Sequence, residues 1–435
     1  MLDGDSVLGL ECGSLTLLAA SAAIGLHLGA NMKILFADAV DASRVAALEA
    51  AGHECLLDPA LTADDLPAAV GDAEIVVVRS TKVTAATIAS ASNLSLIVRA
   101  GAGTDNIDKA AASSAGVYVC NVPGRNAVAV AELTMGLLLA IDRHIADGTA
   151  DLRAGTWNKA RYTKADGLAG KTMAIIGLGD IGLAVAERAK AFGITVQAER
   201  KVGRSESAQA RIRGIGVRLV DDRAELLASA DIVSIHVPKA DSTTGMVDAA
   251  FIAALPNGCI VLNTSRGDVV DEAALLNGLD ERGMRAGLDV FANEPGASTG
   301  PFVSEIAAHH AVVGSHHIGA STTQAQESVA DGMIEVIDAY ANGDMINCVN
   351  MSSAVSGACC ISVRHLDRVG VLAKILNALS SNGHNVEQMS NQLFAGGDAA
   401  VATINIDGPP TDATVGIIEA IDEVIAVSFT GGGNP

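Results

Sequence analysis

The 435-residue chain has few aromatic and few basic side chains. Aromatic residues make up 3% of it, with a single tryptophan, although 49% of its residues are hydrophobic. Its cores must therefore be built mainly from alanine, valine, isoleucine and leucine. Lysine and arginine number 29 against 50 acidic residues, which gives a formal net charge of −21. This balance argues against a nucleic-acid partner, because nucleic acids are bound by clustered lysine and arginine.

Cysteine is also scarce, and its seven residues are scattered. The sequence has no Cys-x-x-Cys pair and no Cys/His cluster with ligand spacing, so it predicts neither a disulfide framework nor a metal site. We expect free thiols and a reducing, cytoplasmic setting. The cysteines are Cys12, Cys55, Cys120, Cys259, Cys348, Cys359 and Cys360.

The beginning of the chain has an apolar run without the features of a leader or a membrane anchor. Residues 15–30 are apolar, but the residues ahead of them are acidic, and no lysine or arginine precedes Lys33. A signal peptide needs positive charge there, and the run is short for a membrane span. We therefore expect no membrane partner and treat residues 1–31 as an extension outside the fold.

The most informative feature that is present is a glycine-rich turn. It follows the apolar residues 173–176 and leads into a helical pattern over residues 183–192. Its first glycine would permit a tight turn, the second would let the backbone approach a pyrophosphate, and the third would let the helix pack closely on the strand. The first amides of the helix would then point at the anion. This pattern predicts an NAD- or NADP-binding turn, formed by Gly177, Gly179, Asp180, Ile181 and Gly182.

Strand-like and helix-like patterns alternate from residue 33 onward. Expected strands lie at 34–37, 74–78, 94–98, 117–120, 172–176, 194–198, 232–236, 259–262 and 287–290. This alternation predicts the α/β class, with two doubly wound, Rossmann-like domains and a cleft between them. We expect one long helix over residues 127–147, and we expect the helix at 322–341 to return to the first domain. The expected domains are residues 32–131 with 318–347 for the substrate, and residues 132–317 for the dinucleotide.

Beyond residue 347 the composition changes. Residues 348–358 are mostly small and form the expected linker. Residues 359–430 then follow the order strand, helix, strand, strand, helix, strand, which is typical of a ferredoxin-like α+β unit. The expected elements lie at 359–363, 369–381, 386–393, 399–406, 413–420 and 424–429.

Three segments after the glycine turn place candidate catalytic groups at the ends of predicted strands. These groups are Arg266 in Asn-Thr-Ser-Arg-Gly, Glu294 in Asp-Val-Phe-Ala-Asn-Glu-Pro and His317 in Ser-His-His-Ile-Gly. Ligands bind at the carboxyl edge of such sheets, so the three groups should lie together. Arginine can hold a carboxylate or polarise a carbonyl, histidine can exchange a proton, and a carboxylate can orient the imidazole, as 2-keto-acid reduction requires. Taken singly, Arg266 could instead belong to a surface ion pair, Glu294 could be a solvated acid, and His317 could be a structural histidine.

With these motifs, residues 32–429 resemble the D-isomer-specific 2-hydroxyacid dehydrogenase family, most closely its members that act on 3-phosphoglycerate. The resemblance implies that Arg266 is the substrate arginine and that Glu294 and His317 are the catalytic pair. His316 stands where the family often has proline, and the Ile-Gly that follows assigns the catalytic role to His317. The resemblance also implies cofactor contacts at Thr264, Ser265, Asp289 and Gly319.

Two predicted strands of the first domain also end in arginine, namely Arg79 and Arg99. Two such arginines at one sheet edge could hold a dianion such as a phosphate, although either could be a salt-bridge partner instead. The resemblance implies that both contact the phosphate or the carboxylate of the substrate. It further implies that the amides of Ala100 and Gly101 cradle the carboxylate and that Asn126 lies in the substrate site.

The position that selects the cofactor departs from the family. NAD-dependent members place an aspartate at the end of the second strand, where it binds the ribose hydroxyls. Here that position is Arg200, flanked by Glu199, Lys201 and Arg204. An arginine would accommodate a 2′-phosphate, so we expect NADP to be used at least as well as NAD, while Glu199 could still reach the ribose.

The C-terminal unit resembles an ACT domain. His365 and Asp367 lie in its strand-to-helix turn, and Asn385 follows its helix. In the members that act on 3-phosphoglycerate, the matching positions bind the effector L-serine between paired domains, and Asp367 here replaces an amide. The resemblance implies inhibition by L-serine. A purely structural, dimerising role is the alternative.

The resemblance as a whole implies reversible hydride transfer between 3-phosphoglycerate and NAD(P), the first step of L-serine biosynthesis, in a homodimer or homotetramer. Arg79 and Arg99 favour a phosphorylated 2-hydroxy or 2-keto acid as the substrate. The nearest alternative is a glyoxylate or hydroxypyruvate reductase of the same fold. The alternative from another class is a nucleotide-sensing scaffold, against which the complete set of arginine, glutamate and histidine argues.

Overall fold

The computed structural model describes residues 31–295, 299–351 and 357–430. The chain falls into two compact units, divided between Asn350 and Met351. Residues 1–30 of the expected extension and residues 352–356 of the expected linker lie outside the described residues.

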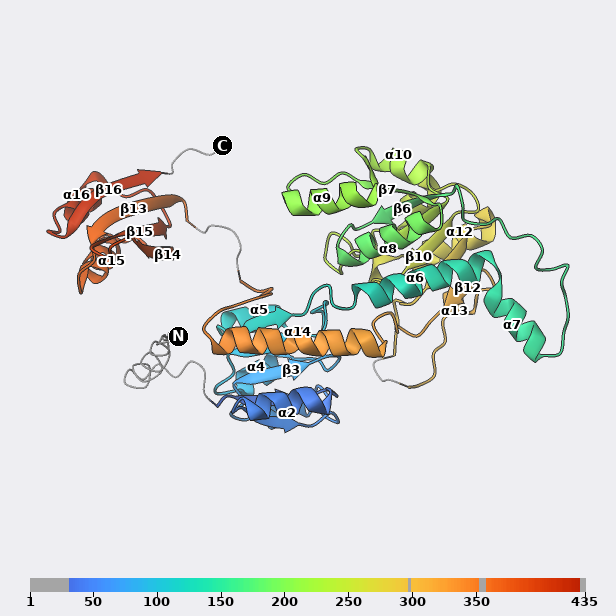
Figure 1. Cartoon of the computed structure of the whole chain (residues 1–435), viewed down its shortest axis with the longest axis horizontal. Coiled ribbons are helices and arrows are strands. Elements are labelled where there is room, and N and C mark those ends of the chain that lie inside the picture. The colour runs from blue at the N-terminus through green and yellow to red at the C-terminus, as the bar shows by residue number, and fades with distance from the viewer. Residues whose placement is uncertain (1–30, 296–298, 352–356, 431–435) are drawn as a thin grey trace, which may run out of the picture. The chain divides into compact units, whose positions relative to one another are not determined.

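The first unit begins with a five-stranded parallel sheet in the order β2-β1-β3-β4-β5, one of the two common doubly wound orders (Figure 1). Its strands are β1 (Lys33–Phe36), β2 (Glu54–Leu57), β3 (Ile75–Val78), β4 (Leu96–Arg99) and β5 (Tyr118–Asn121). The helices between them are α2 (Ala42–Ala50), α3 (Leu66–Ala69), α4 (Ala85–Ser90) and α5 (Lys109–Ser114). The central strand β3 is buried along its whole length, as expected when both faces of a sheet are covered.

A helix from far along the chain completes this first domain. α14 (Thr323–Ala341), orange in Figure 1, contacts α2 and β4. Its Met333, Val336 and Ile337 are buried in the same core as Phe36 of β1. Side chains from α3, α4 and α5 form a second core with other residues of the sheet. The sheet therefore has a packed core on each face.

The second domain of this unit is a seven-stranded parallel sheet in the order β12-β11-β10-β9-β6-β7-β8. Its strands are β6 (Thr172–Ile176), β7 (Thr195–Glu199), β8 (Arg218–Val220), β9 (Ile232–Ile235), β10 (Ile260–Asn263), β11 (Arg285–Leu288) and β12 (Val312–Gly314). Its helices are α6 (Ala127–Asp142), α7 (Ile145–Arg153), α8 (Asp180–Ala191), α9 (Glu206–Ile215), α10 (Arg223–Ala228), α11 (Ala249–Ala254), α12 (Glu272–Arg282) and α13 (Glu305–Ala308), with the 3₁₀ helix η2 (Gly267–Val269). The strand order reverses between β6 and β9, and ligands of such sheets bind at this switch point, beyond the carboxyl ends of the strands.

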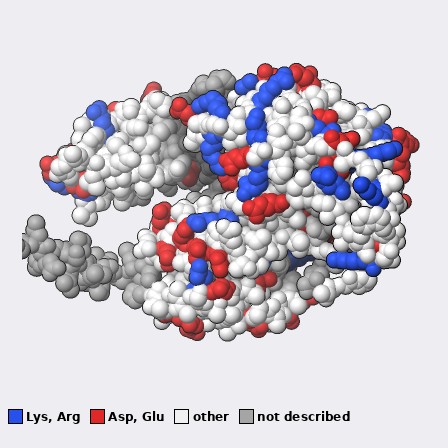
Figure 2. Space-filling model, turned by 45° about the vertical axis from the view of Figure 1, so that its right-hand side comes forward, with Lys and Arg blue, Asp and Glu red and all other residues white. Residues whose placement is uncertain are grey.

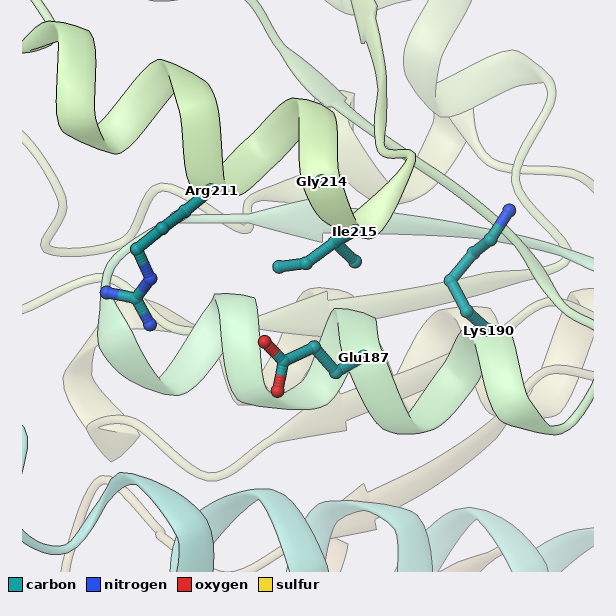
Figure 3. A pocket seen from close by; sticks show the side chains of 5 residues that line it. All are labelled: Glu187, Lys190, Arg211, Gly214 and Ile215. Carbon is teal, nitrogen blue, oxygen red and sulfur yellow. The ribbon is translucent and has the colours of Figure 1, made fainter.

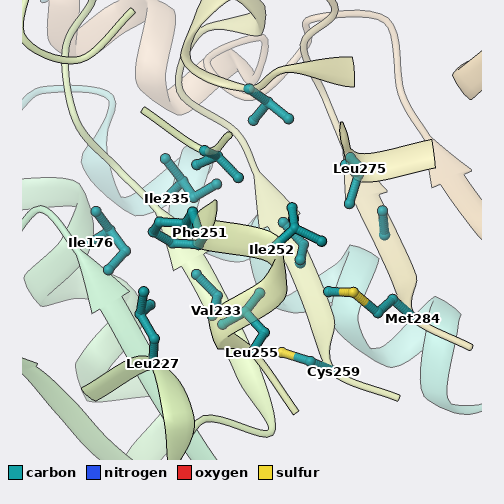
Figure 4. Close-up of a cluster of buried hydrophobic side chains, with 14 of the residues drawn as sticks. Ile176, Leu227, Val233, Ile235, Phe251, Ile252, Leu255, Cys259, Leu275 and Met284 are labelled. Atoms are coloured by element: carbon teal, nitrogen blue, oxygen red, sulfur yellow. The ribbon is translucent and has the colours of Figure 1, made fainter. Parts of the chain in front are cut away.

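Two cores cover the faces of this second sheet. On one face, Met173 and Ile175 of β6 pack with residues of α6 and α8. On the other, Val233 of β9 packs with Phe251 and Leu275 from the helices that cover it (Figure 4). Most side chains in both cores are aliphatic, in keeping with the low aromatic content of the chain.

The expected pair of doubly wound parallel sheets is confirmed, but three strands escaped the sequence analysis. These strands, β2, β8 and β12, all lie at sheet edges. β2 is largely exposed, and β8 and β12 have three residues each. Edge strands are commonly short and need no continuous apolar run, so the periodicity carried no signal for them.

The single helix expected over residues 127–147 is wrong. α6 ends at Asp142, and α7 begins at Ile145. Between them His144 has a φ of 52°, and this left-handed conformation cannot continue a right-handed helix. The buried carboxylate of Asp142 accepts a hydrogen bond from the backbone N–H of Gly167 at 3.0 Å, so the loop that leads to β6 is tied to the helix end.

The second unit is a four-stranded antiparallel sheet in the order β14-β15-β13-β16, with two helices. Its elements are β13 (Cys359–Leu366), α15 (Val371–Ser381), β14 (Val386–Leu393), β15 (Ala399–Ile406), α16 (Asp412–Glu419) and β16 (Val424–Thr430). This arrangement confirms the ferredoxin-like, ACT-like unit. Ile361, Ile375 and Ile404 are fully buried in its core, whereas the edge strand β14 is exposed along almost its whole length.

The surface bears both signs of charge. Basic and acidic side chains are interspersed on the face shown in Figure 2 rather than gathered into separate areas. Within the described ranges, every helix is too short or too polar to traverse a bilayer.

Candidate active site

The glycine turn after β6 is built for close approach of backbone segments. Gly177 has a φ of 103°, and a Cβ there would lie 2.5 Å from the carbonyl oxygen of His236. A Cβ on Gly182 would collide with the carbonyl oxygen of Gly177, so α8 can sit this close to β6 only without a side chain there. Gly179, the N-cap of α8, faces open space. No side chain of the described residues caps this helix, which leaves its first amides for an anion such as a pyrophosphate.

An acidic residue occupies the first turn of α8. The carboxylate of Asp180 is paired with Arg211 of α9 at 3.0 Å, which offsets its charge beside the uncapped first amides of the helix. Arg211 also lines a hollow of about 410 Å³ between α8 and α9, together with Glu187 and Lys190 (Figure 3). None of the predicted cofactor residues lines this hollow, so we assign it no part in the site.

Basic groups follow the end of β7. Nε of Arg200 donates to Oδ1 of Asp221 at 2.6 Å, a bond that leaves the two terminal nitrogens of the guanidinium for another acceptor. Nη1 of Arg204 is buried without a hydrogen-bond partner among the described residues. Glu199, the last residue of β7, is exposed. The terminal nitrogens of Arg200 are therefore the donors here that a phosphate could reach.

His317 and Glu294 form a hydrogen-bonded pair. Nδ1 of His317 lies 2.7 Å from Oε2 of Glu294, and Oε1 of Glu294 accepts from the backbone N–H of Phe291 at 2.9 Å. Burial raises the pKa of Glu294, but the hydrogen bonds from His317 and Phe291, with the charges of His317 and Arg266, outweigh burial and leave this pKa below its ordinary value. The carboxylate therefore stays ionised and orients the imidazole, which leaves Nε2 for proton exchange.

Asp289 supports the segment that carries His317. Its Oδ1 accepts from Ser315 Oγ at 2.7 Å and from the N–H of Ile318 at 2.9 Å, and its Oδ2 accepts from the N–H of Gly319 at 2.9 Å. Its carbonyl oxygen accepts from the N–H of His317 at 2.7 Å. His317 has a φ of 53°, a conformation that costs about 1–3 kcal/mol in a residue other than glycine. The bonds to Asp289 hold this backbone in place, while cofactor contacts of Asp289 and Gly319 stay predictions.

The side chain of Arg266 projects from a turn that hydrogen bonds with Asn263 stabilise. The side-chain oxygen of Asn263 accepts from the N–H of Ser265 at 3.0 Å and from its hydroxyl at 2.7 Å, and its Nδ2 donates to the carbonyl oxygen of Arg266 at 2.9 Å. Thr264 is tied to α6 by a 2.9 Å hydrogen bond between its hydroxyl and that of Thr134. Asn263, Thr264 and Ser265 are buried, so the turn is a fixed base for the Arg266 side chain.

The turn also lies directly against the segment of Glu294. A Cβ on Gly267 would collide with the backbone carbonyl of Phe291, the residue whose N–H binds Glu294. The charge of Arg266 helps to lower the pKa of Glu294, which requires the two side chains to be near each other. The structure thus brings Arg266, Glu294 and His317 together.

Arg99 and Arg266 come from different sheets and lie over the same loop. A Cβ on Gly101 would overlap the guanidinium of Arg99, and a Cβ on Gly103 would overlap that of Arg266. Nε of Arg99 is buried and has no hydrogen-bond partner among the described residues. Burial, followed by the charges of Arg266 and Arg79, lowers the pKa of Arg99 to about 10, so the group is still charged at neutral pH. A buried cation beside two others is favourable only with an anion nearby.

Arg79 lies at the start of a loop that hydrogen bonds to Asp38 hold in place. Oδ2 of Asp38, just after β1, accepts from three successive backbone N–H groups, those of Arg79 at 2.7 Å, Ser80 at 3.1 Å and Thr81 at 3.0 Å. Asn126 is the N-cap of α6, and its Oδ1 is buried without a partner among the described residues. Asn126 therefore keeps a polar atom that no other described residue binds.

The amides expected to cradle a carboxylate are already bonded. The N–H of Ala100 donates to Val78 at 2.8 Å, and that of Gly101 donates to the carbonyl of Arg99 at 2.8 Å. An N–H bonded to one carbonyl has little capacity for a second acceptor. The amides of Ala100 and Gly101 are thus already engaged in this structure, whereas the neighbouring guanidinium groups offer further donors.

The three predicted effector residues take part in the C-terminal unit in different ways. His365 is buried on β13, with Nδ1 2.8 Å from the carbonyl oxygen of the next residue and Nε2 3.1 Å from Asn391 Oδ1. Asn385 donates to Glu387 at 2.9 Å, and Asp367 is exposed in the turn before α15. An effector could meet Asp367 directly, whereas His365 would have to give up a bond.

Three side chains that shape this site were not among the predicted residues. Asn263 had a signal, because an asparagine two residues before a serine often binds its backbone. Asp38 had a weaker one, as an acidic residue directly after the first predicted strand. Asp105 had none, because it pairs with Arg266, 161 residues away in sequence.

Comparison with known proteins relates most of the first unit to one family. Residues 135–319, which include the glycine turn, Arg266, Glu294 and His317, match the NAD binding domain of D-isomer specific 2-hydroxyacid dehydrogenases. Hydroxypyruvate reductase of Thermotoga maritima is 40% identical over 279 residues, which are 64% of this chain and 88% of that protein.

D-3-phosphoglycerate dehydrogenase of Methanocaldococcus jannaschii is 40% identical over 323 residues, which are 74% of this chain. The chain spans about 60% of the length of the phosphoglycerate dehydrogenases that it matches. The NAD+-bound 3-phosphoglycerate dehydrogenase of Entamoeba histolytica superposes with a TM-score of 0.60 at 26% identity, covering 74% of this chain and 99% of that one.

Replacing His317 by alanine is expected to raise the pKa of Glu294. The substitution removes the hydrogen bond and the charge that offset burial of the carboxyl group, and burial alone raises this pKa. The measurement is a pH titration of carboxyl ¹³C shifts in glutamate-labelled protein, with Glu294→Gln to assign the signal. His316→Ala is the matched control, because the Glu294 hydrogen bond comes from the neighbouring histidine. An unchanged Glu294 titration in His317→Ala would contradict the pairing.

Proposed function

The chain belongs to the D-isomer specific 2-hydroxyacid dehydrogenases, and we propose that it interconverts 3-phosphoglycerate and 3-phosphohydroxypyruvate with a nicotinamide cofactor. The observation that carries this choice is the arginine cluster. The charges of Arg266 and Arg79 both act to lower the pKa of Arg99, which is buried and whose Nε has no hydrogen-bond partner among the described residues. A substrate with a carboxylate and a phosphate would supply the anions that such a cluster favours. The phosphoglycerate dehydrogenases among the relatives support the same choice.

The residues of the site divide the reaction between them. The nicotinamide cofactor, when bound, donates or accepts the hydride, and the uncapped amides of α8 with the open space at Gly179 suit its pyrophosphate. Arg266 holds the carboxylate and polarises the neighbouring carbonyl group. During reduction Nε2 of His317 gives a proton to the forming hydroxyl, and during oxidation it takes the proton back. Glu294 stays ionised and favours the protonated imidazole.

Hydroxypyruvate reduction is the second candidate function. Its support is the hydroxypyruvate reductase relative, which this chain covers over 88% of its length. Hydroxypyruvate carries the same keto and carboxylate groups but no phosphate. The two candidates therefore differ in what Arg79 and Arg99 bind, and a substrate panel separates them.

The purified protein is expected to reduce 3-phosphohydroxypyruvate with a higher kcat/KM than hydroxypyruvate or glyoxylate. Arg79→Gln should raise KM for the phosphorylated substrate by about tenfold or more, the value of one charge-assisted hydrogen bond, and should change KM for hydroxypyruvate far less. Arg125→Gln is the control, because Arg125 is paired with Glu335 at 2.6 Å. Steady-state kinetics measure both effects. Equal losses on both substrates would argue against a phosphate site, and faster reduction of hydroxypyruvate would favour the second candidate.

We propose that NADP serves at least as well as NAD. The support is Arg200, whose terminal nitrogens are not used in its bond to Asp221. These nitrogens could bind a 2′-phosphate, and Arg200 stands where NAD-dependent members have aspartate.

Arg200→Asp is expected to lower kcat/KM for NADPH by about tenfold or more and to leave kcat/KM for NADH unchanged or higher, because a carboxylate repels a 2′-phosphate and can bind a ribose hydroxyl. Arg218→Asp on the neighbouring strand β8, where Arg218 pairs with Glu225, is the control. A strong preference of the wild-type protein for NADH would overturn the proposal.

We propose further that two C-terminal units pair and that L-serine binds there and inhibits. The support is β14, an edge strand exposed over nearly its whole length with Met389 and Leu393 open to solvent. Asp367 and Asn385 offer a carboxylate and an amide that suit the amino and carboxylate groups of an amino acid. The unpaired cysteines of the described residues agree with a reducing, cytoplasmic setting for such an enzyme.

Millimolar L-serine is expected to lower the rate and to raise the melting temperature, because a ligand that binds only the folded protein stabilises it. Asp367→Ala should abolish both effects, whereas Asp412→Ala in the first turn of α16 should leave them intact. Sedimentation equilibrium reports the oligomeric state in the same samples. A wild-type protein unaffected by L-serine in both measurements would rule out the regulation.

A further inference from the structure

Arg266 is held by a carboxylate from the other domain. Its Nε donates to Oδ2 of Asp105 at 2.8 Å, and its Nη1 donates to the carbonyl oxygen of Ser265 at 2.7 Å. Nη2 lies over Gly103, the residue that has no Cβ to obstruct it. Two directed bonds from different nitrogens fix the plane of a guanidinium group. Arg266 is therefore oriented by Asp105 and by its own turn before any substrate binds.

The loop that presents Asp105 is itself immobilised. It runs from β4 to α5 in the first domain, and side chains from three places tie its backbone or its neighbours down. The bonds are Asn121 Nδ2 to Ala102 O at 2.6 Å, Lys109 Nζ to Thr104 O at 3.3 Å and Asn106 Nδ2 to Thr81 O at 2.8 Å. Asp105 is thus a fixed point of the first sheet, whereas Arg266 belongs to the second.

The negative charge of Asp105 offsets the repulsion between Arg266 and Arg99. Arg266 lies close enough to Arg99 for its positive charge to be the largest influence on the Arg99 pKa after burial, and it acts to lower that pKa. Asp105 is the first of the groups that act in the opposite direction. Without this carboxylate the two guanidinium groups would repel each other across the loop that they share.

We propose that Asp105 is a positioning residue: it holds the Arg266 guanidinium beside Arg99 in the orientation that polarises the substrate carbonyl. The inference rests on the proposed 2-keto-acid chemistry of this site. Asp105 touches no reacting atom, so its loss disturbs the geometry of the reaction rather than the attraction for the substrate. The free enzyme without Asp105 carries one more net positive charge at the anion site, which opposes any loss of substrate affinity.

The test compares Asp105→Ala, Asp105→Asn and Asp108→Ala in the full chain. Asp105→Asn keeps an acceptor for Nε of Arg266 but removes the charge. Asp108, three residues further along, caps α5 by accepting from the N–H of Ala111 at 3.0 Å, so its substitution is the matched control for loss of a nearby carboxylate.

The first measurement needs no substrate. In ¹⁵N-labelled protein, the Nε–H signal of Arg266, assigned by its loss in Arg266→Lys, is expected in the wild type and in Asp108→Ala as a slowly exchanging, hydrogen-bonded group. It should shift and exchange faster in Asp105→Ala, because its acceptor is gone. A signal unaffected by Asp105→Ala would overturn the proposal, whatever the enzyme reduces.

The second measurement uses the best 2-keto acid from the substrate panel. We expect Asp105→Ala to lower kcat by about tenfold or more with KM for the keto acid no higher, Asp105→Asn to recover part of kcat, and Asp108→Ala to change neither. An unchanged kcat in Asp105→Ala, or a loss confined to KM, would contradict the positioning role. If the wild type reduced no keto acid, the proposed function would fail, and the Nε–H signal alone would decide whether Asp105 places Arg266.

Discussion

The presence of three positive charges at one site, one of them buried, is the constraint on which this site depends. Nε of Arg99 has no hydrogen-bond partner in the described part of the chain, and the charges of Arg266 and Arg79 both act to lower the pKa of this group. The carboxylates of Asp38 and Asp105 offset part of the repulsion among these positive charges. Asp38 also holds the backbone of Arg79, and Asp105 also holds the side chain of Arg266. The rest of the compensation has to come from an anion. Because Arg266 follows a strand of one sheet and the other two arginines lie at strand ends of the other sheet, this demand would couple the binding of an anion to the arrangement of the two domains.

A second regularity concerns how the loops at the carboxyl ends of the strands are held. Beyond a strand the backbone has lost its ladder of hydrogen bonds, so its polar groups need other partners. Asp38 accepts hydrogen bonds from three successive backbone amides. Asn263 bonds to backbone groups at both ends of the turn that contains Arg266. Asp289 accepts hydrogen bonds from three groups around His317. In each case a single short polar side chain replaces the missing strand neighbour and thereby aims a neighbouring functional residue.

The sequence was sufficient for features that repeat along the chain or follow from steric necessity. The buried strands, the glycine turn and the order of the C-terminal unit all have periodic or compositional signals, and the clash that a Cβ would cause at Gly182 shows why that spacing is informative. Features decided by tertiary contact had no such signal. The edge strands β2, β8 and β12 offer apolar runs of only two or three residues. His144 breaks a helix without glycine or proline, and the bonded amide of Ala100 depends on its place in the sheet.

The return of α14 to the first sheet has a consequence for biosynthesis. On the ribosome, β1 to β5 emerge well before Met333, Val336 and Ile337, which complete one core of that sheet. Apart from the part that α2 covers, this apolar face therefore stays exposed while the whole second domain is translated, and domains otherwise tend to fold in the order of their synthesis. The second domain in the chain is then the first able to finish folding, and the nascent N-terminal half is the part most in need of shielding from aggregation.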